Sequence, residues 1–464
     1  MQYASRAVSR QPPNFIGREL ELAALREAYG EEAASLILLS GRRRIGKSYL
    51  LQRFVEGRNA IFYQATRQAE GEELRSFTRE VTAAMPGSLP PDYVFPTWEA
   101  ALEFLDRPSG PEKRIVILDE FPYLCDTTPG LPSIVQRWWD RRGRTSRTML
   151  ILCGSAQTFM DDLDAGSAPL HQRFTGKISL EPLSYREAGD FFPSLSPADR
   201  VRVYSILGGT PLYLEQWRPA RSLRENVLAL FGDPRSALVD SAQLVLHTDL
   251  GDATAAYRVL GAVARGSTRR NEILQKARVT NERVLQRLED LRLLAKIVPV
   301  TEGSASRRGY FAVKDPYFRF WFRFIEPNRA AIDRGLGERL IDDVVLPALD
   351  EHIGPIFEEL AREFVIGLIA AGELPGLEIG SWWSTDGNHE IDIVAMAKKR
   401  VTTIGTVKWR AAPLGRDVYR NLAEHARALG VDESIPWLMI GRGGVEPELL
   451  RAEPHVRGYD IGAL

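Results

Sequence analysis

The segment Gly41-Arg42-Arg43-Arg44-Ile45-Gly46-Lys47-Ser48 matches the phosphate-loop pattern in full, and it constrains the fold more than any other part of the chain. An apolar run, Leu36 to Leu39, leads into the loop, and a helical pattern, Tyr49 to Val55, follows it. Gly41 and Gly46 permit backbone angles that turn N–H groups toward phosphate oxygens. The sequence therefore predicts an α/β fold with a P-loop parallel sheet that binds ATP.

Within the loop, Lys47 is expected to contact the β- and γ-phosphates, and the Ser48 hydroxyl to ligate Mg²⁺. The N-terminus of the following helix adds a partial positive charge. A P-loop binds phosphate through its backbone, so the three arginine side chains need not touch ATP, and we expect them to face solvent or another domain. The predicted nucleotide-binding residues here are Gly41, Arg42, Arg43, Arg44, Ile45, Gly46, Lys47, Ser48 and Tyr49.

A second apolar run, Ile115 to Leu118, ends in Asp119 and Glu120. Four consecutive apolar residues predict a fully buried strand, and ligands of open α/β sheets bind at the carboxyl ends of such strands. Asp119 can hold magnesium, and Glu120 can polarise the attacking water. Without a P-loop the same pair would more often be a solvated strand end.

Two further positions are candidates for the catalytic set, besides Glu120 and Lys47. Ser155 follows another buried run, Met149 to Leu152, and could sense the γ-phosphate or hold the attacking water. The alternative is that it caps a helix or loop. Arg173 is either an arginine finger for a neighbouring subunit or an ordinary surface arginine, and the sequence does not favour one over the other.

The chain has 464 residues, which suggests roughly three domains. Its formal net charge of -1 gives no global field that attracts nucleic acid, so any such binding must come from a local patch. The longest apolar stretches are far shorter than the about 20 residues that span a bilayer. With two cysteines and no signal-like segment, we expect a soluble cytoplasmic protein without a membrane partner.

The pattern of expected strands and helices changes along the chain. Strand and helix patterns alternate first, with Ala60 to Tyr63 as a further strand, and helical periods follow. The last part reads as a helix followed by strands and another helix. We predict a P-loop ATPase core at 14–180, a helical lid at 181–250, a winged helix at 251–313, a linker at 314–345 and a small α/β domain at 346–464.

The segment from Tyr257 to Val313 reads as helices and then two short strands around a polar loop, which is the order of a winged helix. Arg283 and Arg287 on its third helix, and Arg307 and Arg308 on the expected wing, could contact DNA phosphates. The same helix also carries acidic residues that dilute a positive face: Glu282, Glu289 and Asp290. The alternative is a protein-contacting module that transmits nucleotide state to the C-terminal domain.

Several motifs together resemble those of prokaryotic AAA+/STAND-like ATPases with a DUF234-type C-terminal domain, and the resemblance covers almost the whole chain. They are Phe15-Ile16-Gly17-Arg18-Glu19, Gly41 to Ser48, Asp119-Glu120-Phe121, Gly154-Ser155-Ala156, Gly208-Gly209-Thr210-Pro211 and Asp315-Pro316-Tyr317-Phe318-Arg319-Phe320-Trp321. In these ATPases they are the adenine-side motif, Walker A, Walker B, the sensor, the lid motif and the boundary signature. The resemblance thus adds Phe15 and Ile16 to the nucleotide-binding residues, and it implies an ATP-driven switch that usually oligomerises.

The resemblance also implies a C-terminal domain similar to PD-(D/E)XK nucleases. Glu358 would be its helical carboxylate and Asp392 its strand carboxylate, so that both could bind a second metal ion, with Glu390 as a substitute. Lys408 matches the family's lysine, but Thr406 stands where a carboxylate is expected. This departure favours a degenerate scaffold or binding domain over active cleavage. Asp392 and Lys408 could equally form an ordinary cross-strand ion pair.

Three functional hypotheses remain open. The first is a magnesium-dependent ATPase that acts as a nucleotide-controlled switch on DNA. The second is a signalling or scaffold ATPase whose nucleotide state controls homo-oligomerisation and partner binding without nucleic acid. The third is an ATP-gated nuclease.

Overall fold

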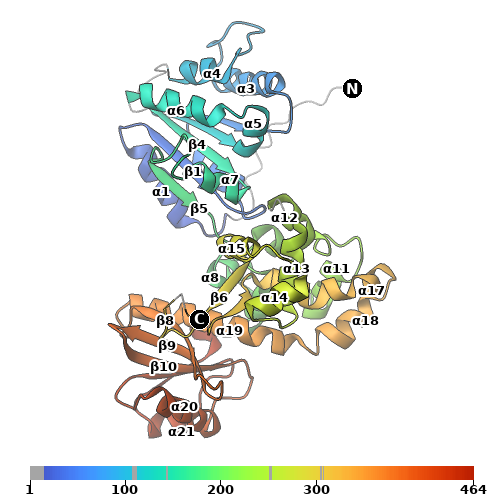
Figure 1. The fold of residues 1–464 in the computed structure, drawn as a ribbon, viewed down its shortest axis with the longest axis vertical. Coiled ribbons are helices and arrows are strands. Elements are labelled where there is room, and N and C mark those ends of the chain that lie inside the picture. Colours follow the sequence, from blue (N-terminus) through green and yellow to red (C-terminus); the bar gives the residue numbers. More distant parts are fainter. Residues whose placement is uncertain (1–14, 107–111, 143–144, 250–252, 304–305, 307) are drawn as a thin grey trace. The chain divides into compact units, whose positions relative to one another are not determined.

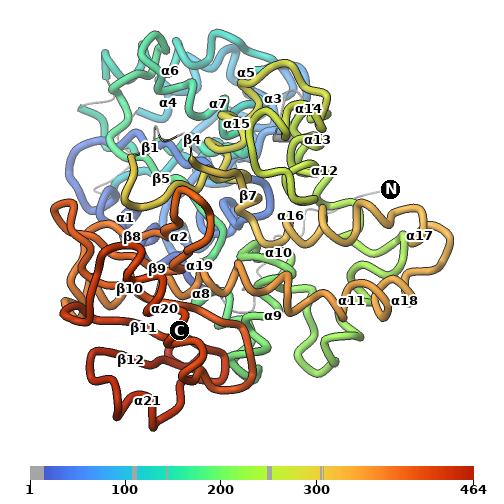
Figure 2. Tube along the Cα trace, turned by 60° about the horizontal axis from the view of Figure 1, so that its bottom comes forward, coloured from blue at the N-terminus to red at the C-terminus, as the bar shows by residue number. Residues whose placement is uncertain are grey.

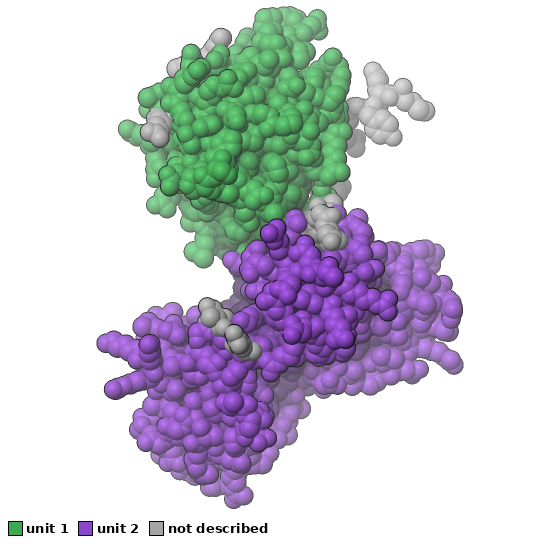
Figure 3. All heavy atoms as spheres, in the orientation of Figure 1, with its two compact units in different colours: residues 1–183 green, residues 184–464 purple. Residues whose placement is uncertain are grey.

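The computed structural model describes residues 15–106, 112–142, 145–249, 253–303, 306 and 308–464. The chain divides into two compact units, Met1–Leu183 and Ser184–Leu464 (Figure 3). The first unit contains the phosphate loop. The second contains the segments expected to form the lid, the winged helix and the C-terminal domain.

The first unit is built on a five-stranded parallel sheet with the order β2-β3-β4-β1-β5. Four of its strands lie where apolar runs predict them, and each is one to three residues longer than its run. The fifth, β5, was not expected as a strand. The strands are β1 (Ser35–Ser40), β2 (Ala60–Gln64), β3 (Arg114–Asp119), β4 (Thr148–Gly154) and β5 (Gly176–Ser179).

Helices cover both faces of this sheet (Figure 1). On one face, Ile37 and Ile117 pack with apolar residues of α1 (Glu19–Gly30) and α2 (Lys47–Val55). On the other face, Leu38 and Val116 pack with the remaining large helices. Those helices are α3 (Glu70–Ala84), α4 (Trp98–Leu105), α5 (Phe121–Thr127) and α6 (Leu131–Arg141). Because both faces are buried, the central strands β1, β3 and β4 are largely apolar, and the polar site residues lie at or just after their carboxyl ends.

The second unit begins with helices and continues with a hairpin. The helices are α8 (Tyr185–Gly189), α9 (Pro197–Leu207), α10 (Pro211–Leu214), α11 (Leu223–Phe231), α12 (Ser241–Asp249), α13 (Ala253–Ala264), α14 (Arg270–Ala277) and α15 (Arg283–Asp290). The hairpin pairs β6 (Leu294–Ile297) with β7 (Tyr310–Val313) in antiparallel register. Three helices followed by a hairpin is the order that the sequence predicts for 251–313.

The segment 314–345, which we expected to be a linker, is mostly helical, and its first part, from Pro316 to Ile325, is largely buried. It consists of α16 (Pro316–Phe320), a π-helical turn (Trp321–Ile325), a 3₁₀ turn (Glu326–Asn328), α17 (Arg329–Asp333), α18 (Gly337–Leu340) and a second π-helical turn (Ile341–Val345). The Tyr317 hydroxyl donates to the Leu238 carbonyl at 2.9 Å, and Trp321 Nε1 donates to the Val239 carbonyl at 2.7 Å. The aromatic side chains at its start therefore form core packing between helices, and the domain bounds that make this segment a linker stay a prediction.

The C-terminal part has a mixed five-stranded sheet with the order β12-β11-β10-β9-β8 (Figure 2). Its strands are β8 (Glu378–Trp383), β9 (Glu390–Ala397), β10 (Arg400–Lys408), β11 (Trp437–Gly441) and β12 (Val456–Tyr459). The long helix α19 (Leu349–Ala370) precedes the sheet, and α20 (Arg416–Leu429) packs on one face of it through Leu422 and Ala426. A short helix, α21 (Pro447–Ala452), connects the last two strands. Within the described ranges, no helix is both long and apolar enough to cross a membrane.

Candidate nucleotide site

The phosphate loop joins β1 to α2 and is shaped by its two glycines. Gly41 has a φ of 153° and Gly46 a φ of 94°, values that favour glycine. A Cβ atom on Gly41 would lie 2.6 Å from Ile45 Cδ1 and 2.8 Å from the Leu180 carbonyl oxygen. Only glycine fits at this position, so the loop's backbone can curl as a phosphate cradle requires.

The two residues expected to bind phosphate and magnesium follow the second glycine directly. Lys47 is 6% exposed, and its Nζ donates to the carbonyls of Gly41 at 2.7 Å and Arg42 at 3.0 Å. The Ser48 Oγ donates to Asp119 Oδ2 at 2.6 Å. A hydroxyl and a buried carboxylate at this distance form a donor set that suits Mg²⁺. The structure thus brings together the side chains of β1's loop and β3's end that the sequence assigns to one metal ion.

Glu120 and Ser155 also lie in contact. Glu120 follows β3 in a left-handed conformation, with a φ of 53°. The Ser155 hydroxyl, at the end of β4, donates to Glu120 Oε2 at 2.8 Å. Cys153 lies buried beside this site, and burial, followed by the charge of Asp119, raises the pKa of its thiol well above the ordinary value. The thiol therefore stays neutral, and Glu120 and Asp119 are the acids at this edge.

The expected adenine-side motif reaches the same helix as the loop. The Phe15 ring stacks on the Tyr49 ring with centroids 5.8 Å apart and planes 9° apart. Arg18, from the same motif, is buried and donates to the carbonyls of Ile45 at 3.2 Å and Glu181 at 2.6 Å. This arginine ties the phosphate loop to the segment after β5. Its position in the Phe15–Glu19 motif was the signal for it, although sequence reasoning gave it no role.

The loop arginines were expected to face solvent or another domain, but two of them lie against the first unit itself. Arg42 is buried, and Arg43 donates from its guanidinium to the Tyr123 hydroxyl on α5. Arg173 lies before β5 and forms a two-pronged ion pair with Asp140 on α6, with Nε and Nη2 each 2.9 Å from a carboxylate oxygen. The structure does not bring Arg173 to the phosphate loop, and its proposed role toward a neighbouring subunit stays a hypothesis.

Of the carboxylates considered in the C-terminal domain, Asp392 is held by protein donors. Asp392 Oδ2 accepts from Val407 N at 2.7 Å, Thr406 Oγ1 at 3.0 Å and Lys408 Nζ at 3.1 Å. Burial, and then the charge of Asp392, raises the pKa of Glu358 well above its ordinary value. The structure thus shows the cross-strand ion pair that the sequence left as an alternative. In the described part of the chain, no group of three or more His, Cys, Asp or Glu side chains is arranged to hold a metal ion.

The arginines considered for DNA contact are only partly free. Arg283 is exposed on α15, and Arg287 is half-buried. Arg308 pairs with Glu302 and donates to the Trp383 carbonyl. Arg307 lies outside the described residues.

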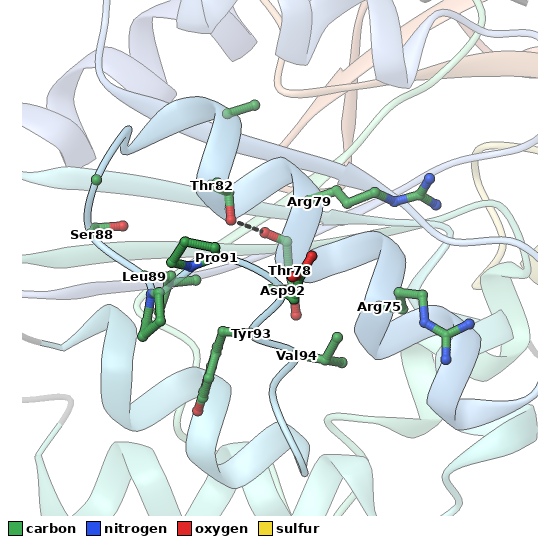
Figure 4. A pocket seen from close by; sticks show the side chains of 13 residues that line it. Arg75, Thr78, Arg79, Thr82, Ser88, Leu89, Pro91, Asp92, Tyr93 and Val94 are labelled. Carbon is green, nitrogen blue, oxygen red and sulfur yellow. Dashed lines mark hydrogen bonds between the residues drawn. The ribbon is translucent and has the colours of Figure 1, made fainter. Parts of the chain in front are cut away.

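A hollow of about 1270 Å³ opens between α3 and the segment 87–94 (Figure 4). Arg75, Arg79 and Tyr93 are among its lining residues, and Arg75 already pairs with Glu72 at 2.7 Å. It shares no residue with the phosphate loop or the strand ends that carry the acids. The hollow is therefore separate from the candidate nucleotide site.

Comparison with known proteins agrees with this geometry. An ATPase domain found predominantly in Archaea matches residues 15–217, and DUF234, a domain of archaeal and bacterial proteins of unknown function, matches residues 321–421. An uncharacterized protein of Methanocaldococcus jannaschii is 30% identical over 430 residues, which cover 90% of this chain and 93% of that protein. An uncharacterized ATP-binding protein of the same organism is 43% identical over 44 residues, or 10% of this chain and 75% of that protein.

Solved structures with a similar arrangement are more distant. A Walker-type ATPase of Pyrococcus abyssi is 18% identical, with a TM-score of 0.47 over 66% of this chain and 96% of that one. The ORC2 protein of Aeropyrum pernix is 14% identical, with a TM-score of 0.45 over 73% of this chain and 96% of that one. On the full-length relative and the two matched domains, the chain belongs to the family of proteins that join this P-loop ATPase domain to a C-terminal DUF234 domain.

Proposed function

We propose that the protein is a magnesium-dependent ATPase whose nucleotide state acts as a switch. The observation that carries the proposal is the contact of Ser48 with Asp119 at 2.6 Å, beside Lys47 and the Glu120–Ser155 pair. These groups come from separate segments of the chain and converge at one edge of the sheet. They comprise the P-loop lysine, the hydroxyl and carboxylate that suit magnesium, and an acid that could position water, which are recurring parts of P-loop phosphoryl-transfer sites.

Each side chain has a distinct part in this proposal. Lys47 and the loop N–H groups hold the β- and γ-phosphates, and bound Mg²⁺ neutralises charge on the phosphate oxygens. Glu120 orients the attacking water and accepts its proton. The Ser155 hydroxyl restrains the Glu120 carboxylate and thereby keeps it aimed at the water.

Substitution of two residues separates binding from hydrolysis. Lys47→Ala should lose ATP binding in a fluorescence titration. Glu120→Gln should bind ATP normally and lose about 100-fold or more in kcat, because positioned general-base catalysis contributes about 10²–10⁴-fold. Glu103→Gln, an exposed acid on α4, serves as the matched control and should behave as the wild type. Normal hydrolysis by Glu120→Gln would show that the catalytic assignment is wrong.

The contacts of the 251–313 module favour an output of the switch through the C-terminal domain over an output through DNA. The segment after β6 and the start of β7 both contact β8 of the C-terminal sheet. Val300 N donates to the Ser381 carbonyl at 2.9 Å, and the Tyr310 and Trp383 rings lie 5.3 Å apart. Arg308, expected to be free for DNA, is bound to the same strand. We therefore propose that this module, a winged helix by its element order, passes nucleotide state to the C-terminal domain.

Light scattering with ATP or ADP, in the absence of DNA, tests this output. A nucleotide-dependent change in mass supports a switch that controls assembly. If mass stays constant and duplex DNA is instead retained at low salt, with loss in an Arg283→Ala/Arg287→Ala double variant, the switch acts on DNA. Cleavage of DNA that disappears in Asp392→Ala would establish the nuclease alternative.

A further inference from the structure

Two arginines and a tyrosine form a cluster at the carboxyl edge of the first sheet that the proposed catalytic set does not use. Arg43 comes from the phosphate loop, Tyr123 from α5 and Arg67 from the segment after β2. Arg43 donates to the Tyr123 hydroxyl. The Arg67 guanidinium carbon lies 4.6 Å from the centroid of the Tyr123 ring. We call this set the Tyr123 cluster.

The cluster carries positive charge that is not neutralised by acids. In the ranges that the structure describes, neither Arg43 nor Arg67 forms an ion pair with a carboxylate. A guanidinium that lies over an aromatic ring is fixed by cation–π attraction, and its N–H edge stays open to a second partner. Such an edge matches the oxygens of a phosphate group two at a time. The cluster is therefore suited to an anion.

A buried carboxylate fastens the segment that carries Arg67. Glu73 on α3 is 0% exposed and accepts hydrogen bonds from Tyr63, from Thr66 and from Gln68 N. Burial, and then the hydrogen bond to Glu73, raises the pKa of Tyr63 far above its ordinary value, so its hydroxyl stays a donor. One carboxylate, Glu73, thus holds the residues on both sides of Arg67, and this fixes the backbone position from which the arginine side chain extends.

The strand order places this segment near the end of the nucleotide that carries the terminal phosphate. Ala65 N donates to the Asp119 carbonyl at 2.9 Å, so Arg67 lies two residues along the chain from a backbone partner of the residue expected to bind magnesium. Tyr123 lies three residues after Glu120, the group proposed to activate water. The expected adenine side lies elsewhere, because Phe15 packs on Tyr49 at the start of α2. In the order β2-β3-β4-β1-β5, Arg67 is on the side of the acids and away from the adenine motif.

We propose that Arg67, held on Tyr123, pairs with the γ-phosphate and makes the site distinguish ATP from ADP. The inference rests on the proposed nucleotide function and deepens it. Arg43 orients the tyrosine through its hydroxyl, and Glu73 holds the segment that presents Arg67. Because ADP lacks the γ-phosphate, the contribution of Arg67 is confined to the triphosphate.

Titration of the full chain with a non-hydrolysable β,γ-imido ATP analogue and with ADP, both with Mg²⁺, tests this role. Arg67→Gln should weaken analogue binding about 10-fold or more and change ADP binding less than about 2-fold, since each phosphate contact of this kind is charge-assisted. Tyr123→Leu should shift the ratio in the same direction. Arg67→Lys should recover only part of it, because lysine keeps the charge and loses the planar fork. Retained ADP binding shows that each variant is folded.

Arg75→Gln is the matched control, because Arg75 is an exposed arginine on α3 that pairs with Glu72, and its affinity ratio should equal that of the wild type. If the wild type binds neither nucleotide, the proposed function itself fails. If it binds both and Arg67→Gln alters both affinities equally, or neither, only the role of Arg67 is overturned. An unchanged ratio with reduced retention of duplex DNA would overturn it in favour of a nucleic-acid contact.

Discussion

At the scale of single residues, burial decides which charges the protein can carry. Glu120, Asp119 and Lys47 lie at one edge of a sheet, where each has a polar partner. His352, on the first turns of α19, has a different environment. It is 1% exposed, its Nε2 lies 3.0 Å from the Ser205 carbonyl, and the Phe320 and Phe324 rings pack on it edge-on.

His352 should make folding sensitive to acid. Burial, partly opposed by the hydrogen bond to Ser205, lowers the pKa of His352 from 6.5 to about 3. As pH falls below about 6.5, this side chain takes up a proton in the unfolded chain but stays neutral in the folded chain. The stabilising effect is fully present above pH 6.5 and is lost as pH falls toward 3. Between pH 7.5 and 5 this one group should cost about 2 kcal/mol.

The measurement is the free energy of unfolding by urea at several pH values. His352→Gln keeps an N–H donor for the Ser205 carbonyl and has no titrating ring, so its curve should be flatter than the wild-type curve by about this amount. His247→Gln, at an exposed histidine of α12, should follow the wild type. Parallel curves for wild type and His352→Gln would contradict the buried neutral state.

At the scale of elements, α18 approaches α11 so closely that a methyl group does not fit. A Cβ atom on Gly337 would lie 1.9 Å from the Gly232 carbonyl oxygen at the end of α11. Arg224 on α11 reaches across to Asp342 at 2.6 Å, beyond α18. The close backbone contact and the ion pair thus fix the distance between α11 and α18.

Gly337→Ala should therefore lower the free energy of unfolding by about 1–3 kcal/mol or more, because overpacking forces backbone shifts. Gly367→Ala is the control within α19, where an added Cβ meets nothing within 4 Å. That substitution should stabilise by up to about 1 kcal/mol, since alanine favours helix over glycine. Denaturant midpoints measure both changes, and equal effects of the two substitutions would mean that the close approach is not real.

Elements with a local signature were predictable from sequence. The buried strands β1, β3 and β4 are continuous apolar runs, and the phosphate loop has a fixed spacing. β5 was missed because Gly176–Ser179 is short and contains only one large apolar residue, Ile178. The full length of α19 (Leu349–Ala370) was not predictable, because it contains Pro355, a residue that normally signals a helix end.

The site was predictable to the extent that its residues follow strands. Ser48, Asp119, Glu120 and Ser155 meet because carboxyl ends of parallel strands share one edge. The burial of Arg42 and the contact of Arg67 with Tyr123 were not predictable, because they depend on how α5 and the segment after β2 pack. No spacing in the sequence relates these residues to one another.

At the scale of the whole molecule, the nucleotide-contacting residues proposed above all belong to the unit Met1–Leu183. Mg-ATP at about 100 times its Kd should stabilise this unit by about 2.7 kcal/mol. Hydrogen exchange should show the gain in the amides of β1, β3 and β4, and Lys47→Ala should remove it. An equal gain throughout Ser184–Leu464 would show that the two units unfold as one.

The fastening of the Thr66–Gln68 segment by Glu73 has a consequence for the cost of binding. A segment that becomes ordered only when a ligand arrives loses conformational entropy at that moment, about 1–2 kcal/mol for each backbone residue fixed. Here the hydrogen bonds to Glu73 restrict the segment during folding, and the hydroxyl of Tyr63 is part of the same arrangement. The conformational entropy of the segment is therefore lost once, when the protein folds, and not again in each cycle of nucleotide binding and release.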